Sequence, residues 1–224
     1  MNNNFIFDNS NNELNKLARL YDVKKGDIQH DYTRWYNFYL SSLRYNNFNL
    51  LEIGIAQGKS IKMWKEYFKN SKIYGIEINN SVINKELVKG CDIFIGNQTD
   101  KKFLKEIAGK IQNGLDIIID DGAQNTLDRI ITFNYLFKKL NPGGIYVIEN
   151  LQTYYQKKFN NKYSKSLVEY LKNKIDELNF NGKFKCNSFK RVSKKSTILN
   201  NYEKYILGIS FHAGICFIFK RFCK

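Results

Sequence analysis

No hydrophobic run in this chain is long enough to cross a membrane. Not one stretch of eighteen consecutive apolar residues occurs among its 224 residues, whereas a membrane-spanning helix needs about 20. Residues 1–8 also lack the basic and apolar regions of a secretory signal peptide. We therefore expect a soluble, cytoplasmic protein with no membrane insertion.

Cysteine is scarce too, and its spacing gives no metal site. The four cysteines are Cys91, Cys186, Cys216 and Cys223, and no two of them have the spacing of a zinc site. Two lie in apolar segments that are typical of strands. We interpret them as reduced packing residues.

Acidic residues are few in the last third of the chain. Residues 1–150 carry a formal net charge of +3 and residues 151–224 carry +12, out of +15 in total. Within that last third, residues 183–195 place six lysines and arginines around Phe184 and Phe189. Such a segment suits RNA, the diphosphate of a sugar nucleotide, or solvent alone. A solvated basic surface is the most frequent of these outcomes.

Residues 50–60, with the sequence LLEIGIAQGKS, are the stretch around which the chain is organised. An apolar run ends in Glu52, Gly54 and Gly58 follow, and an amphipathic pattern starts at Ile61. This order predicts a strand, a tight turn and a helix. In an open α/β sheet, a ligand binds at such a turn.

The turn lacks two well-known phosphate signatures. A P-loop has four residues between its glycines, and this turn has three. A dinucleotide fingerprint has a glycine where this chain has Ala56. S-adenosylmethionine has no phosphate: its cationic sulfonium suits Glu52, directly or through ordering of the loop, and its carboxylate suits the helix N-terminus near Ser60. A tight turn without a ligand stays open as the alternative.

Two further segments extend this predicted cofactor site. A second strand at 72–78 ends at Glu77 and Ile78, and a carboxylate at this offset accepts the ribose hydroxyls of an adenosine. After a third strand, Asn97 and Gln98 are expected to face the adenine.

Polar side chains also follow the next two buried strands. One strand ends in the adjacent carboxylates Asp120 and Asp121, and the next ends in Glu149 and Asn150. One of the two adjacent carboxylates would suffice as a cap for the following helix. Two of them at the carboxyl end of a strand favour chemistry or a metal ion.

The remaining pattern predicts the fold class. Apolar residues at helical spacing predict helices at 11–21 and 32–43, joined by a polar loop at 24–32. Five parallel strands followed by a hairpin at 205–219 predict an α/β fold. This fold is a Rossmann-like, seven-stranded mixed sheet with helices on both faces, a terminal antiparallel hairpin and an N-terminal helical cap.

No linker or internal repeat divides the chain, so we expect a single domain over residues 1–224. Residues 1–48 would form the helical cap or lid and residues 49–224 the Rossmann-like core. We also expect a turn at 141–144, which holds the only proline. The helix after the fourth strand should bury Leu127, Ile130, Ile131 and Phe137, and a later helix should bury Leu167, Tyr170, Leu171, Ile175 and Leu178.

With these elements in place, the chain resembles the class I S-adenosylmethionine-dependent methyltransferases. More narrowly, it is similar to the sugar O-methyltransferases of antibiotic and capsule pathways, the group of the mycinamicin and macrocin O-methyltransferases, which is related to cephalosporin-hydroxylase-type proteins. The resemblance rests on KG at 25–26 with His30 and Tyr32, LEIG at 51–54, GKSIKMW at 58–64, IYGIE at 73–77, DIIIDDG at 116–122, LNPGGIYVIE at 140–149, and SF at 210–211 with FIFK at 217–220. It implies S-adenosylmethionine as cofactor and S-adenosylhomocysteine as product. It also implies methylation of a sugar hydroxyl, with a sugar nucleotide or a capsule or glycan precursor as the acceptor.

Two departures from the family pattern bear on the chemistry. The family usually has DDGSH where this chain has DDGAQ at 120–124, so Gln124 replaces the histidine thought to act as base. The family has EDL where this chain has ENL at 149–151, so a magnesium ligand has lost its charge. We therefore expect Mg²⁺ to be weakly bound or dispensable, with Asp121 and Glu149 as its ligands if an ion binds.

The resemblance and the residues together give the expected site. The catalytic candidates are Asp120 and Asp121, with His30 from the lid as a second base and Gln124 orienting a sugar hydroxyl. The cofactor candidates are Glu52, Gly54, Gly58, Ser60, Glu77, Ile78, Asn97, Gln98 and Asp120. The substrate candidates are His30, Tyr32, Gln124, Glu149 and Asn150.

Two other functions stay open. A nucleic-acid methyltransferase would use the basic last third, although the Asn-Pro-Pro-Tyr-type motif of amino-group methylases is absent after the fourth strand. A protein that binds the cofactor without catalysis would account for Gln124 and Asn150. As partners we expect a small sugar or sugar-nucleotide substrate and no nucleic acid, and a homo-oligomer stays open.

Overall fold

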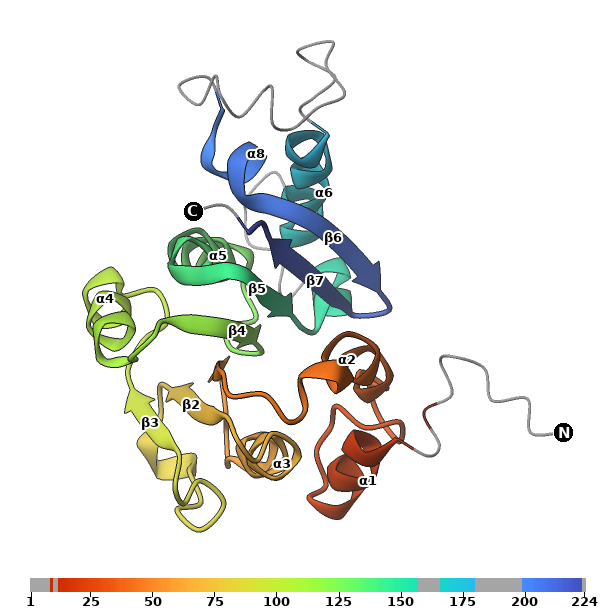
Figure 1. The fold of residues 1–224 in the computed structure, drawn as a ribbon, viewed down its shortest axis with the longest axis vertical. Coiled ribbons are helices and arrows are strands. Elements are labelled where there is room, and N and C mark those ends of the chain that lie inside the picture. Colours follow the sequence, from red (N-terminus) through yellow and green to blue (C-terminus); the bar gives the residue numbers. More distant parts are fainter. Residues whose placement is uncertain (1–8, 10–11, 157–165, 180–198, 223–224) are drawn as a thin grey trace, which may run out of the picture.

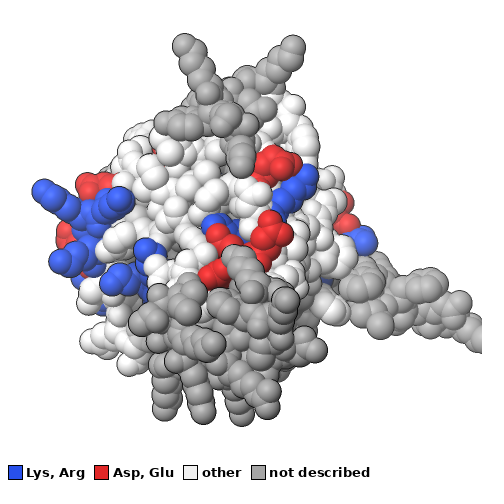
Figure 2. All heavy atoms as spheres, turned by 90° about the horizontal axis from the view of Figure 1, so that it is seen from above, with Lys and Arg blue, Asp and Glu red and all other residues white. Residues whose placement is uncertain are grey.

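The computed structural model describes Asn9 and residues 12–156, 166–179 and 199–222. The basic segment at 183–195 lies outside the described residues, as do Cys186 and Cys223. The two described cysteines, Cys91 and Cys216, are free thiols. In the described part of the chain, no helix is both long and apolar enough to span a bilayer. On the face drawn in Figure 2, the described lysines and arginines form separate groups divided by uncharged surface.

Seven strands form one mixed sheet in the order β3-β2-β1-β4-β5-β7-β6 (Figure 1). The strands are β1 (Asn49–Ile53), β2 (Lys72–Glu77), β3 (Asp92–Ile95), β4 (Leu115–Asp120), β5 (Leu140–Ile148), β6 (Ile206–His212) and β7 (Ile215–Lys220). Strands β1 to β5 pair in parallel, and β7 runs antiparallel between β5 and β6. The predicted mixed sheet with its terminal hairpin is confirmed. The strand order reverses beside β1, and a ligand crevice is expected at the carboxyl ends of the strands there.

Helices cover both faces of this sheet (Figure 1). The helices are α1 (Glu13–Leu20), α2 (Thr33–Leu40), α3 (Lys59–Tyr67), α4 (Lys101–Lys110), α5 (Thr126–Lys139), α6 (Leu167–Leu178) and α8 (Asn201–Tyr205), with short 3₁₀ turns η1 (Ser41–Leu43), η2 (Asn80–Val82) and η3 (Leu151–Tyr155). Successive strand residues point to opposite faces. Leu50 therefore packs with α1, α2 and α3, whereas Leu51 packs with α4, α5 and α6.

The two N-terminal helices pack directly against the sheet. Leu14 of α1 and Tyr36 and Leu40 of α2 are fully buried, in the same apolar cluster as Trp64 of α3. Burial of one such side chain stabilises the fold by roughly 1.5–3 kcal/mol. The loop between α1 and α2 is thus anchored at both ends. The two predicted amphipathic helices are confirmed, and their role as a lid stays a prediction.

Helix α5 buries only part of the predicted face: Phe137 is buried and Ile130 packs against the core, but Leu127 does not. Leu127 is 37% exposed, and the buried residues of the helix include Arg129, Phe133 and Leu136. The buried face of α5 includes Arg129 because of its hydrogen bonds. The buried guanidinium donates to the backbone carbonyls of Ala123 (2.6 Å), Asp120 (2.6 Å) and Glu149 (2.9 Å). An apolar pattern gives no sign of a buried arginine.

Two other local predictions were wrong. Ile175 of α6 is 43% exposed, because Lys174 takes the buried position and lays its ammonium 3.8 Å from the centre of the Tyr202 ring. The expected turn at 141–144 is an irregular part of β5, where the pairing register with β4 shifts. Gly143 has φ +81° there, a conformation that favours glycine.

Candidate functional site

Two adjacent cavities open at the carboxyl ends of the parallel strands. The first cavity has a volume of about 450 Å³, and its lining includes Gly54, Glu77, Ile78, Asn97, Gln98, Asp121 and Gln124. The second cavity has a volume of about 520 Å³, and its lining includes Lys24, Lys25, Gln29, Lys59 and Ser60. Gly54, Ala56 and Asp121 line both cavities. A ligand that fills both would therefore pass over Gly54 and beside Asp121.

The backbone conformation and the close neighbours require glycine at both predicted positions, Gly54 and Gly58. Gly54 has φ +81°, and a Cβ there would lie 2.5 Å from the Gly122 Cα and 2.6 Å from the Asp121 carbonyl oxygen. Gly54 thus lets the ends of β1 and β4 approach each other. Gly58 has φ +92° at the start of α3, and the space beside it is filled by Val88.

Glu77 holds the turn after β1 in place. Its carboxylate accepts hydrogen bonds from the backbone N–H groups of Ala56 (2.8 Å), Ile78 (3.0 Å) and Asn79 (3.1 Å). Ala56 has φ +47°, a conformation that is costly for a residue other than glycine. The Glu77 contact offsets part of this cost, and the same carboxylate borders the first cavity.

The side chain of Gln98 forms hydrogen bonds within the protein that the sequence did not predict. Its amide nitrogen donates to the Thr132 hydroxyl (3.0 Å), and its amide oxygen accepts from the backbone N–H of Ala123 (2.7 Å). Asn97, which also borders the first cavity, accepts from the backbone N–H of Thr99 (2.9 Å). Both residues reach the cavity wall while they fix the loops around it.

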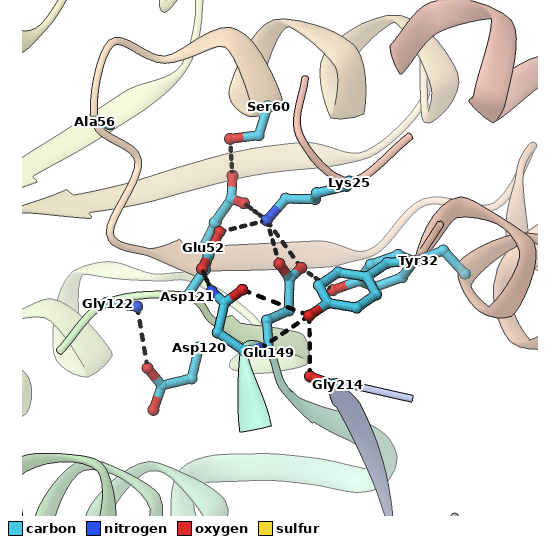
Figure 3. Close-up of polar contacts among 12 residues, drawn as sticks. Lys25, Tyr32, Glu52, Ala56, Ser60, Asp120, Asp121, Gly122, Glu149 and Gly214 are labelled. Carbon is cyan, nitrogen blue, oxygen red and sulfur yellow. Dashed lines mark hydrogen bonds and ion pairs between the residues drawn. The ribbon is translucent and has the colours of Figure 1, made fainter. Parts of the chain in front are cut away.

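Asp120 is absent from the lining of both cavities, and its side chain points away from Lys25 in Figure 3, so the geometry does not support its predicted catalytic and cofactor-binding roles. Its side chain is fully buried, accepts a hydrogen bond of 3.0 Å from the Tyr146 hydroxyl, and lies 3.6 Å from the Arg129 Nε. Burial raises the pKa of Asp120, against the lowering effect of Arg129. The structure therefore makes Asp120 a structural group between β4, β5 and α5.

Lys25 lies at the centre of the site, among three carboxylates (Figure 3). Its Nζ is 2.7 Å from Asp121 Oδ2, 2.8 Å from both oxygens of Glu149, and 3.1 Å from Glu52 Oε1. Burial opposes the charge of the ammonium, but the neighbouring carboxylates hold the pKa of Lys25 well above its usual value. Lys25 therefore stays charged at neutral pH.

Glu52 and Glu149 each have a further, neutral donor. The Ser60 hydroxyl donates to Glu52 (2.6 Å), and the Tyr36 hydroxyl donates to Glu149 (2.5 Å). Burial raises the pKa of Glu149 to about 8, although Lys25 lowers it. Burial also raises the pKa of Glu52. Glu52 thus contacts the start of α3 through Ser60, and its role toward a cofactor stays a prediction.

Asn150 and Tyr32 lie next to Asp121 but are not in the lining of either cavity. The Asn150 amide donates to Asp121, and the Tyr32 hydroxyl donates to the carbonyl oxygen of Gly214 (3.1 Å). His30 stacks on Tyr32 with ring centroids 5.2 Å apart. Burial lowers the pKa of His30, against the raising effect of the Asp121 charge, so its imidazole is neutral at pH 7.

Sequence reasoning missed two residues of this site. The sequence pattern places Lys25 only in the KG motif at 25–26 and Tyr36 only within the predicted helix at 32–43. Lys25 is 96 residues from Asp121 and 124 from Glu149 along the chain, so no local pattern connects them. Several carboxylates that converge in the interior require a cation nearby, and this requirement was the signal that could have indicated a lysine at the site.

No family model matches the chain. The chain is 29% identical, over 86% of its length, to the 8-demethyl-8-alpha-L-rhamnosyl tetracenomycin-C 2'-O-methyltransferase of Streptomyces olivaceus, of which it covers 50%. It is 33% identical, over 64% of its length, to the demethylmacrocin O-methyltransferase of Streptomyces fradiae, of which it covers 37%. This chain resembles the sugar O-methyltransferases of antibiotic biosynthesis.

A solved structure supports the same resemblance. The MycE methyltransferase from the mycinamycin biosynthetic pathway, in complex with Mg and SAH, superimposes with a TM-score of 0.80 and 26% identity, over 94% of this chain and 55% of that one. The resemblance to sugar O-methyltransferases inferred from the sequence is thus confirmed. The chain spans about half the length, or less, of the curated relatives it matches.

Proposed function

We propose that this protein is an S-adenosylmethionine-dependent O-methyltransferase that acts on a sugar hydroxyl. The observation that carries the proposal is the meeting of the two cavities at Gly54 and Asp121. The first cavity is bordered by the residues expected to bind an adenosine. The second is bordered by the loop between α1 and α2, which is the place expected for an acceptor.

In this proposal the cofactor lies along the ends of β1, β2 and β4. Its adenosine occupies the first cavity, with the ribose hydroxyls at Glu77 and the adenine near Asn97. Its methionine part crosses Gly54, so the sulfonium faces Asp121. The similarity to a methyltransferase bound to SAH supports this placement.

Methyl transfer is an in-line displacement on a carbon that the sulfonium already activates. The protein then has to align the acceptor oxygen and take up its proton. Asp121 borders both cavities, and its side chain keeps 25% of its surface exposed. A carboxylate is a weak base towards an alcohol, so it would accept the proton late, when the acceptor oxygen has become acidic. Neutral His30 is the second candidate, and Gln124 would orient a sugar hydroxyl.

For the acceptor we propose a sugar nucleotide or a glycan precursor. Lys24 and Lys59 border the second cavity, and a diphosphate would suit these cations. The named relatives are methyltransferases of glycosylated antibiotics, so a small-molecule glycoside is the competing acceptor class.

A turnover screen tests the proposal. The purified chain is incubated with S-adenosylmethionine and either sugar nucleotides, small-molecule glycosides or RNA, and both S-adenosylhomocysteine and the methylated acceptor are measured by mass spectrometry. We expect methylation in the sugar-nucleotide set. Transfer to glycosides alone would correct the acceptor, and transfer to RNA alone would overturn the sugar assignment. Tight cofactor binding with no turnover on any acceptor would favour a non-catalytic binding protein.

A further inference from the structure

The ammonium of Lys25 occupies the point where three carboxylates from three separate strand ends converge (Figure 3). Glu52 comes from β1, Asp121 follows β4, and Glu149 follows β5. The Lys25 residue is 3% exposed, and its Nζ makes ion pairs with all three at distances between 2.7 and 3.1 Å. A buried cation with this many partners is more than a packing residue, because each unpaired carboxylate would be costly in the interior.

The similar MycE structure contains Mg, so the residues here can be examined for their fit to a divalent ion. Mg²⁺ needs carboxylate oxygens at about 2.0–2.1 Å in octahedral geometry. In this chain the oxygens of Asp121 and Glu149 that face the centre of the site are already bound by the Lys25 ammonium. A metal ion on the same oxygens would lie beside a like charge, which is unfavourable.

The side chain of Asn150 also suits the lysine better than a metal. Its amide nitrogen donates to Asp121, so the amide presents a donor to that carboxylate where a metal site would need a further anionic oxygen. Among the residues that the structure describes, no cluster of three or more histidine, cysteine, aspartate or glutamate side chains is arranged to hold a metal. The residues present therefore do not fit Mg²⁺ while Lys25 is in place.

We propose that the Lys25 ammonium, together with the neutral Asn150 amide, positions Asp121 and Glu149 without any metal. The proposal does not depend on the acceptor, or on whether the protein turns over. It makes Lys25 a positioning residue: the ammonium fixes the direction of the Asp121 carboxylate at the junction of the two cavities. Since Lys25 lies in the loop between α1 and α2, it also attaches this loop to the sheet.

The test measures binding of Mn²⁺, a spectroscopic substitute for Mg²⁺, by electron paramagnetic resonance. We expect the wild-type protein to show no Mn²⁺ site that depends on Asp121. The double variant Lys25→Ala with Asn150→Asp removes the ammonium and adds a carboxylate, and we expect it to gain one Mn²⁺ site at least about ten-fold tighter than any site of the wild type. Adding Asp121→Asn to the double variant should remove that site.

Lys174→Met is the matched control, because Lys174 is also a buried, ion-paired lysine but lies on α6, away from the strand ends. It should leave Mn²⁺ binding unchanged. A Mn²⁺ site in the wild type that is lost in Asp121→Asn would overturn the proposal, and so would a folded double variant that gains no site. If the double variant does not fold, the comparison of Mn²⁺ binding between the wild type and Asp121→Asn still tests the proposal. Since the readout is metal binding, a protein without turnover in the acceptor screen leaves this result unaffected.

Discussion

The carboxylate of Glu77 accepts a hydrogen bond of 2.8 Å from the backbone N–H of Ala56, which joins the end of β2 to the turn after β1. One carboxylate thereby supports the wall of the first cavity and is also available to a ligand inside it. Loss of this carboxylate should therefore weaken cofactor binding through the missing contact with the ligand and through the altered wall of the cavity.

We expect Glu77→Ala to weaken binding of S-adenosylmethionine by about 1–3 kcal/mol, because ribose hydroxyls would lose their acceptor. Isothermal titration calorimetry measures the change. Glu86→Ala is the control, since Glu86 is an exposed carboxylate outside the lining of both cavities. Unchanged affinity in the Glu77 variant would remove this residue from the cofactor site.

Gly54 and Gly109 offer a matched pair of glycine-to-alanine changes. At Gly54 a Cβ would lie 2.5–2.6 Å from the backbone of Gly122 and Asp121, at φ +81°, whereas at Gly109 in α4 nothing lies within 4 Å. We expect Gly54→Ala to destabilise the fold by roughly 2 kcal/mol or more and Gly109→Ala to stabilise it by about 0.5–1 kcal/mol. Urea unfolding measures both, and equal effects would contradict the close approach of β1 and β4.

The raised pKa of Glu149 predicts a loss of stability with rising pH. Burial raises this pKa from its ordinary value of 4.5 to about 8, so the folded protein retains a proton that the unfolded chain releases. The stabilisation is fully present below about pH 4.5 and is lost as the pH rises through 8. We expect the free energy of unfolding to fall over this window in the wild type. In Glu149→Gln the slope should be smaller, and an identical slope would exclude Glu149 as its source.

Asp121 should matter for turnover more than for cofactor affinity. We expect Asp121→Asn to lower kcat by roughly 10²–10⁴-fold, with the Kd for S-adenosylmethionine changed little. Asp92→Asn, at an exposed carboxylate on β3, serves as control. Full turnover in Asp121→Asn would leave His30 as the base, and His30→Asn would then show the loss instead.

The elements of this fold could be predicted because each buried strand is bounded by polar or glycine residues. The convergence of Glu52, Asp121 and Glu149 also followed from the sequence, since parallel strands bring their carboxyl ends to one edge. The orientation of neighbouring acids was harder to assign. Asp120 and Asp121 point to opposite sides, as successive strand residues do, and the choice between them depends on Arg129 and Lys25, which come from distant segments.

The buried guanidinium of Arg129 has a consequence for ligand affinity. It fastens the carbonyl groups of Asp120 and Glu149, the residues directly before Asp121 and Asn150. The backbone that presents these two side chains is therefore ordered when the chain folds, before any ligand arrives. Binding of a ligand at this edge therefore does not have to offset the loss of conformational entropy that ordering this backbone would cost. The affinity for the ligand is higher for that reason.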